Sequence, residues 1–108
     1  MRTLEVLFLG FLLLPASLRA GPMYGSVTQG GRGVANTHIR VQCPGGPFEG
    51  DTIGDGSFRF NVSQEGRCTF TLTAFPGASA IVFSYAKPTH YDFELLPRPG
   101  GQYELRVR

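Results

Sequence analysis

The sequence predicts an all-β fold, a seven- to eight-stranded antiparallel β-sandwich, and three observations lead to this prediction. From residue 23 onward, apolar and polar side chains alternate with a period of two, as they do on the two faces of a half-buried strand. Helical periodicity is almost absent from the same region. Glycine and proline clusters recur at short intervals, and short strands separated by such turn signals are typical of sandwiches and barrels.

The N-terminal segment has the pattern of a secretory signal peptide. Arg2 precedes an apolar run at residues 6–14, and a stretch of small and turn-forming residues ends at Ala20. This run is far shorter than the roughly 20 apolar residues that cross a bilayer, so we expect no membrane anchor. The 108 residues therefore divide into a signal peptide at 1–20 and one domain at 21–108, and the product is expected to be secreted or periplasmic.

Four strands are expected in the first half of the domain, at residues 23–28, 37–43, 48–53 and 57–62. The glycine-rich stretch 29–33 is a flexible turn after the first strand. Segment 44–47 ends the second strand, because proline cannot donate to a ladder and glycine permits positive φ. The Asp55-Gly56 pair between the third and fourth strands is a hairpin signal.

Four more strands are expected in the second half, at residues 67–75, 80–85, 91–95 and 102–108. In the first of these, threonines alternate with apolar residues, which suits a strand with one solvated face. Pro76-Gly77 breaks that strand, residues 87–90 form a loop, and the proline- and glycine-rich segment 97–101 makes the last turn. The final strand places its apolar residues on one face and its charged residues on the other.

Cys43 and Cys68 are the two cysteines, and export would place them in an oxidising compartment. Alternation puts Cys43 on the face of Ile39 and Val41, and Cys68 on the face of Phe70, so both thiols should point into the core. No C-x-x-C spacing or histidine cluster favours a redox pair or a metal site. We therefore predict a structural disulfide that closes a loop of about 25 residues.

The charge balance excludes several classes of partner. Without residues 1–20, which contain Arg2, Arg19 and Glu5, eight basic residues face seven acidic ones. The basic residues are scattered singly, whereas binding to nucleic acid or to an acidic membrane surface needs clustered cations. We expect neither a nucleic-acid partner nor a membrane partner, and no motif calls for a cofactor.

Four segments resemble the carboxypeptidase regulatory-like domain. They are Gly25-Ser26-Val27, the run from Gly33 to Val41, the run from Asp51 to Phe60, and Gly66-Arg67-Cys68-Thr69-Phe70. The resemblance covers about residues 22 to 75 well and the remainder loosely. It implies a transthyretin-like Greek-key sandwich, found as an accessory domain of exported proteins. Its motifs are turn glycines and core positions, which specify a fold rather than a reaction.

The sequence contains no recognisable group of catalytic residues. His38 and His90 are the two histidines, and neither has a legible nucleophile and orienting carboxylate, so we expect surface histidines and no enzyme. Glu49, Asp51 and Asp55 offer oxygen ligands for calcium, but Asp55 suits its own turn better. Lys87, in a loop, is a poor candidate for an isopeptide crosslink. We expect no metal site.

The remaining candidates are a glycosylation sequon and the aromatic-rich C-terminal third. Asn61 begins an Asn-Val-Ser glycosylation sequon. The aromatic residues from 83 to 103 are more than so small a core needs, so either core packing or a partner-facing patch accounts for them. We predict a contact surface for a protein partner around a proline-constrained loop, formed by Tyr85, Lys87, His90 and Tyr91.

Together these features predict an exported, non-catalytic module with a protein-interaction or envelope-structural role. The alternative is a small-ligand or carbohydrate-binding domain that uses loops 29–34, 48–50 and 87–91. The partner itself and the oligomeric state are left open by the sequence.

Overall fold

Nine strands and one short 3-10 helix make up residues 21–108, the part of the chain that the computed structural model describes. The strands are β1 (Pro22–Gln29), β2 (Arg32–Gly33), β3 (His38–Cys43), β4 (Gly46–Asp51), β5 (Ser57–Asn61), β6 (Gly66–Leu72), β7 (Ser79–Ser84), β8 (Thr89–Arg98) and β9 (Gln102–Val107), and the helix is η1 (Pro99–Gly101). The signal peptide expected at 1–20 lies outside the described residues.

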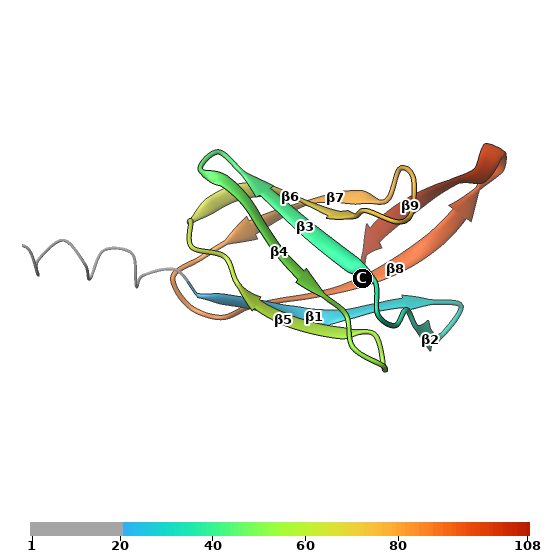
Figure 1. Cartoon of the computed structure of the whole chain (residues 1–108), viewed down its shortest axis with the longest axis horizontal. Helices are drawn as coiled ribbons and strands as arrows, with labels where there is room; N and C mark the ends of the chain where they lie inside the picture. The colour runs from blue at the N-terminus through green and yellow to red at the C-terminus, as the bar shows by residue number, and fades with distance from the viewer. Residues whose placement is uncertain (1–20) are drawn as a thin grey trace, which may run out of the picture.

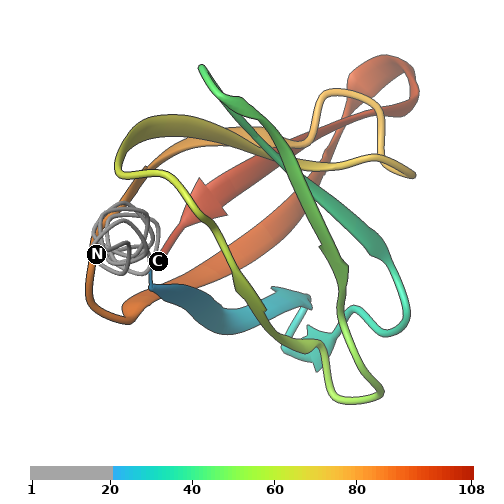
Figure 2. The same ribbon diagram turned by 60° about the vertical axis from the view of Figure 1, so that its left-hand side comes forward.

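The strands form two sheets that face each other (Figures 1 and 2). In the five-stranded sheet the order is β2-β1-β8-β9, and β5 pairs with the first part of β1 on the same side as β2. In the four-stranded sheet the order is β4-β3-β6-β7. The chain crosses between the sheets from β2 to β3, from β4 to β5, from β5 to β6 and from β7 to β8. The all-β, sandwich-like prediction is therefore confirmed.

One pairing departs from the antiparallel prediction. β1 and β8 run parallel, with Gly25 opposite Tyr91 and Ser26 opposite Asp92, so the five-stranded sheet is mixed. Parallel neighbours need a long crossover between them. Here the crossover comprises all of β2 to β7, most of it in the other sheet, and no local pattern in the sequence reveals such a pairing.

The eight expected strands are all present, with shifted ends. β3 and β4 are joined by Pro44-Gly45 alone, so Pro47 lies within β4 rather than in a longer loop. β4 has a single partner strand, and an edge strand tolerates proline because its outer N–H needs no partner. β8 extends to Arg98, beyond the expected 91–95, and β2 is an additional two-residue strand.

The core lies between the sheets and is centred on aromatic rings. Phe70 of β6 and Phe93 of β8 are buried, with ring centroids 4.3 Å apart, and Phe58 of β5 lies 5.3 Å from Phe70. The other large buried side chains are Met23, Val27, Ile39, Val41, Val62, Leu72, Val82, Leu95 and Leu105. Both sheets contribute alternate residues, as the period of two predicts.

Candidate functional site

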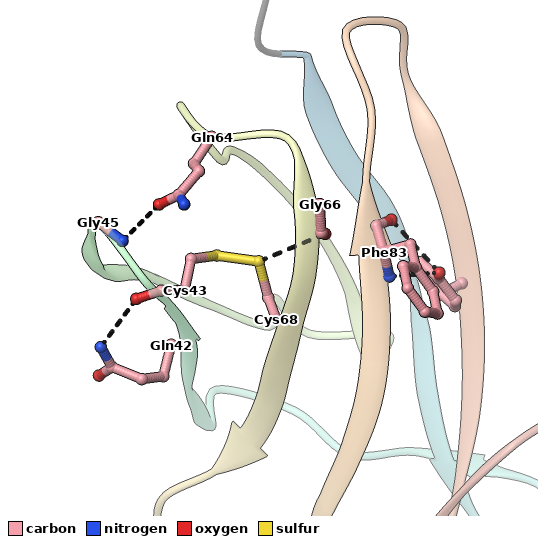
Figure 3. Close-up of a disulfide and its surroundings, with 8 residues drawn as sticks. Gln42, Cys43, Gly45, Gln64, Gly66, Cys68 and Phe83 are labelled. Carbon is pink, nitrogen blue, oxygen red and sulfur yellow. Dashed lines mark hydrogen bonds between the residues drawn. A yellow bond between two sulfur atoms is a disulfide. The ribbon is translucent and has the colours of Figure 1, made fainter.

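The predicted disulfide is present between Cys43 and Cys68 (Figure 3). The cysteines lie opposite each other on the neighbouring strands β3 and β6, with Cα atoms 4.5 Å apart. This is the spacing of a non-hydrogen-bonded antiparallel pair. Both cysteines are buried, so the bridge faces the core, as predicted, and joins two strands of the same sheet.

The four residues predicted to form a contact surface are not brought together. Tyr85 is exposed just beyond the end of β7, and Lys87 is exposed in the loop that follows. His90 lies on the outer face of the other sheet, where its ring stacks on Tyr24 of β1 at 4.9 Å. These exposed side chains therefore lie at the end of β7, in the loop and on the outer face of the other sheet.

Tyr91 is half-buried, and its hydroxyl is already engaged. The ring packs against Phe93, with centroids 5.8 Å apart, from the inward-facing side of β8. The hydroxyl accepts a hydrogen bond from the Phe83 backbone N–H at 2.8 Å and lies 3.3 Å from the Phe83 carbonyl oxygen, to which it can donate. In the free chain the Tyr91 hydroxyl is thus already bonded to the backbone of β7, and its ring is partly covered.

The structure instead exposes a row of large apolar side chains along β7. Ile81, Phe83 and Tyr85 are 45%, 43% and 48% exposed, and their spacing of two places them on the same, outward side. We call these three residues the β7 surface. Sequence reasoning included Phe83 and Tyr85 among the surplus aromatic residues but missed Ile81 as a surface residue.

Cross-strand register explains why the bulkier residues of β7 face outward. Cys68 and Phe70 on β6 point into the core, and their direct partners on β7 are Val82 and Ala80. Directly opposed residues share a face, so the register forces Val82 inward and Ile81 and Phe83 outward. The apolar row is therefore set by the neighbouring strand and not by the hydrophobicity of β7 alone.

A second group on the outer face of the five-stranded sheet contains serine, histidine and aspartate. Ser26 donates to Asp92 Oδ1 at 2.9 Å, and His90 Nε2 lies 3.0 Å from the same oxygen. Burial acts to raise the pKa of Asp92, but the hydrogen bonds from Ser26 and His90 outweigh it and hold that pKa below its ordinary value. Because Ser26 and His90 both bond to the carboxylate and not to each other, the histidine is not placed to activate the serine.

The carboxylates considered for calcium bind other groups. His38 Nδ1 lies 3.2 Å from Asp51 and its Nε2 hydrogen-bonds to Glu49, so the ring bridges two residues of β4. Asp55 accepts from the backbone N–H and hydroxyl of Ser57 within its own turn. Within residues 21–108 no three such side chains converge on one point where a cation could bind.

We expect His38 to make the stability of the β3–β4 pair dependent on pH. The hydrogen bond to Asp51, which has the larger effect, and the hydrogen bond to Glu49 raise the pKa of His38 above its ordinary value of 6.5. A pKa raised in the folded state means that the stabilisation is complete below pH 6.5 and is lost as the pH rises through the raised pKa.

We predict that an NMR titration of the His38 ring will give a midpoint above 6.5. Replacing both partners, Glu49→Gln with Asp51→Asn, should return the midpoint toward the ordinary value, because neutral amides do not favour the imidazolium. The His90→Gln variant assigns the two histidine signals. An unchanged midpoint in the double variant would contradict the bridging role of His38.

The loops considered for a small ligand or carbohydrate do not form one site. The β1–β2 turn follows the C-terminal end of β1, whereas the loop at 87–91 leads into the start of β8. Since β1 and β8 run parallel in register from Met23 opposite Thr89, these loops lie at opposite ends of the sheet. Residues 48–50 lie within β4, and no pocket opens in the part of the chain that the structure describes.

The glycosylation sequon lies at the end of an edge strand. Asn61 is the last residue of β5 and is exposed, as is Ser63, whereas Val62 between them is buried. The acceptor side chain is therefore accessible in the folded domain.

Comparison with protein families, with curated proteins and with solved structures finds no match to this chain. The described residues, 21–108, contain no helix of the length and apolarity that a membrane crossing requires.

Proposed function

We propose that this chain is an exported, non-catalytic β-sandwich module that binds a protein partner through the β7 surface, in an interaction or envelope-structural role. The observation that carries the proposal is the exposed row of Ile81, Phe83 and Tyr85. Export is supported by the signal-like pattern at 1–20 and by the disulfide, which persists in oxidising compartments.

The strand order supports a Greek-key sandwich of the carboxypeptidase regulatory-like, transthyretin-like type. Strands neighbouring in sequence lie in different sheets at four points, and β1 pairs with β5 and β8, which are distant in sequence, as well as with the short strand β2. The segments that carry the resemblance occupy structural positions: Gly25 is opposite β8, and Gly56 takes φ 85° in the turn before β5. These positions account for a fold, so the function has to be found elsewhere on the surface.

The composition of the β7 surface favours a protein partner. Phe83 lies directly opposite Arg67 of β6, and Ile81 lies opposite Thr69, so the aromatic and aliphatic side chains of the β7 surface have one cation beside them. Aromatic residues and arginine are enriched at protein interfaces. Arg67 forms no ion pair with the described residues, which leaves its charge available to a partner.

The residues that could have supported chemistry are engaged with one another. His90, Asp92 and Ser26 form a hydrogen-bonded group without a histidine–serine contact, and His38 is held between two carboxylates. This arrangement supports a module that binds rather than reacts.

We predict that replacing Ile81 and Phe83 together by threonine will lower affinity for the partner by at least about tenfold, because buried aromatic anchors supply most interface energy. Threonine retains β-propensity, so the thermal midpoint should remain near that of the wild type. The matched control is Ile53→Thr with Val107→Thr, two other exposed apolar residues outside β7. Partners are captured from the exported fraction of the native host, identified, and titrated against all three proteins.

Equal affinity of the wild type and the Ile81→Thr/Phe83→Thr variant for every captured protein would refute the proposal. A glycan array provides the other arm: binding to a saccharide that both double variants retain would favour the carbohydrate-binding alternative.

A further inference from the structure

The outer edge of β7 has backbone groups that β6 does not use. Phe83 N–H and C=O point away from β6, since both contact the Tyr91 hydroxyl. Backbone groups in an antiparallel strand alternate in direction, so those of Ile81 point outward as well. Among residues 21–108 the Ile81 N–H and C=O have no hydrogen-bond partner, whereas the Tyr85 carbonyl accepts from Gly21 N–H at 3.2 Å.

The Tyr91 hydroxyl occupies the place that an added strand would take. It accepts from the Phe83 N–H and lies within donating distance of the Phe83 C=O, which is the pair of bonds that one residue of a neighbouring strand would make. The phenol reaches this edge from β8, in the opposite sheet. One side chain thus substitutes for a backbone partner at one residue only.

The other sheet edges differ from that of β7 in their side chains. β4 carries Pro47, Glu49 and Asp51, and β9 carries alternating charged residues, features that discourage strand pairing. On the remaining edge, β5 carries Arg59 and β2 has only two residues, one of them charged. β7 has the sequence Ser-Ala-Ile-Val-Phe-Ser, with neither charge nor proline. No charge or proline on β7 itself therefore opposes the addition of an uncharged strand.

We propose that the outer edge of β7 is a strand-addition site for an extended, uncharged segment of the partner protein, and that the Tyr91 hydroxyl closes this edge in the free chain. The proposal rests on the proposed function and adds the mode of binding. Rotation of the Tyr91 side chain frees Phe83, so that Ile81 and Phe83 together present two N–H and two C=O groups. Alternate apolar side chains of the added strand then pack beside Ile81 and Phe83.

The test uses a labelled peptide that repeats residues 79–84 and carries a lysine tail for solubility. This peptide is the probe because it has the extended, uncharged, apolar character that the edge requires. Tyr91→Phe keeps the ring on Phe93 and removes only the hydroxyl. Its affinity for the peptide, measured by fluorescence anisotropy, should exceed that of the wild type by about tenfold, since the bonds to Phe83 no longer have to be broken.

Ile81→Pro, introduced into the Tyr91→Phe chain, is the matched control. It removes an outward N–H and leaves the ladder to β6 intact, as edge positions allow. Peptide affinity should fall to or below that of the wild type. Should this chain fail to fold by circular dichroism, Ile81→Lys replaces it, because a charge on the edge opposes strand addition without changing the backbone.

Equal peptide affinity in the wild type and in Tyr91→Phe, or insensitivity of the Tyr91→Phe affinity to both Ile81 substitutions, would overturn the strand-addition site. Self-association of Tyr91→Phe that Ile81→Pro abolishes, seen by sedimentation velocity, would support the edge with a second copy as the added strand. Loss of the partner in the Ile81→Thr/Phe83→Thr variant together with a negative peptide result would leave the proposed function standing and remove only this mode of binding.

Discussion

Gly25→Ala is expected to lose on the order of 4 kcal/mol of unfolding free energy, the range of the most damaging single substitutions. Gly25 lies in β1 directly opposite Tyr91 of the parallel strand β8. A Cβ at this position would lie 1.7 Å from the Tyr91 carbonyl oxygen and 2.6 Å from its carbon. Both are backbone atoms of a paired strand, so they cannot move aside unless the β1–β8 ladder opens.

Urea denaturation of the wild type, Gly25→Ala and Gly30→Ala measures the effect. Gly30 is the control because it too has a positive φ, 59° against 155° for Gly25, while nothing lies within 4 Å of the added Cβ. Gly30→Ala should cost only about 1 kcal/mol from backbone strain. Similar losses in the two variants would show that the close approach of β8 is not what requires glycine in β1.

Local signals in the sequence were sufficient for most of the fold. Alternation placed the strands, because a strand with one buried face must repeat every two residues. The Asp55-Gly56 turn and the Pro44-Gly45 turn were visible as residue types that accept tight turns. The pairing of Cys43 with Cys68 followed from their shared inward direction and from their being the two cysteines available.

The parallel β1–β8 pair and the exposed face of β7 could not be read in the same way. Both depend on which strand lies beside which, a long-range property without a local pattern. In β7 the two alternating sets, Ala80 with Val82 and Ile81 with Phe83, are both apolar, so hydrophobicity favours burying the larger set. The structure buries the smaller set because Cys68 and Phe70 on β6 determine the inward face.

The residues of the predicted contact surface are divided over different parts of the fold for the same reason. Tyr85 stayed exposed, but Tyr91 turned out to bond to the backbone of Phe83, a residue of the opposite sheet. His90 and Tyr91 are neighbours in sequence and therefore point to opposite faces of β8. Residues that are close together in sequence point to opposite faces when they lie in a strand. They can share one surface only when they lie in a loop.

Removing the disulfide is expected to cost about 3.5 kcal/mol of unfolding free energy, the effect calculated for closing a loop of about 25 residues. Cys43→Ala with Cys68→Ala eliminates the crosslink and also leaves a small space in the core, since both residues are buried. Cys43→Ala with Cys68→Val restores part of that volume. A loss common to both variants is therefore attributable to the crosslink, and any difference between them to packing.

Urea titrations should show a lower unfolding free energy and a larger m-value in the two variants than in the wild type. The m-value rises because the unfolded chain without the bridge exposes more surface. Mass spectrometry of the non-reduced, exported protein should detect no free thiol. Two free thiols in that protein, or variants as stable as the wild type with an unchanged m-value, would show that the bond contributes nothing to this domain. With β3 and β6 already paired through their backbones, the bridge acts mainly by restricting the unfolded chain and by filling the core beside Val82.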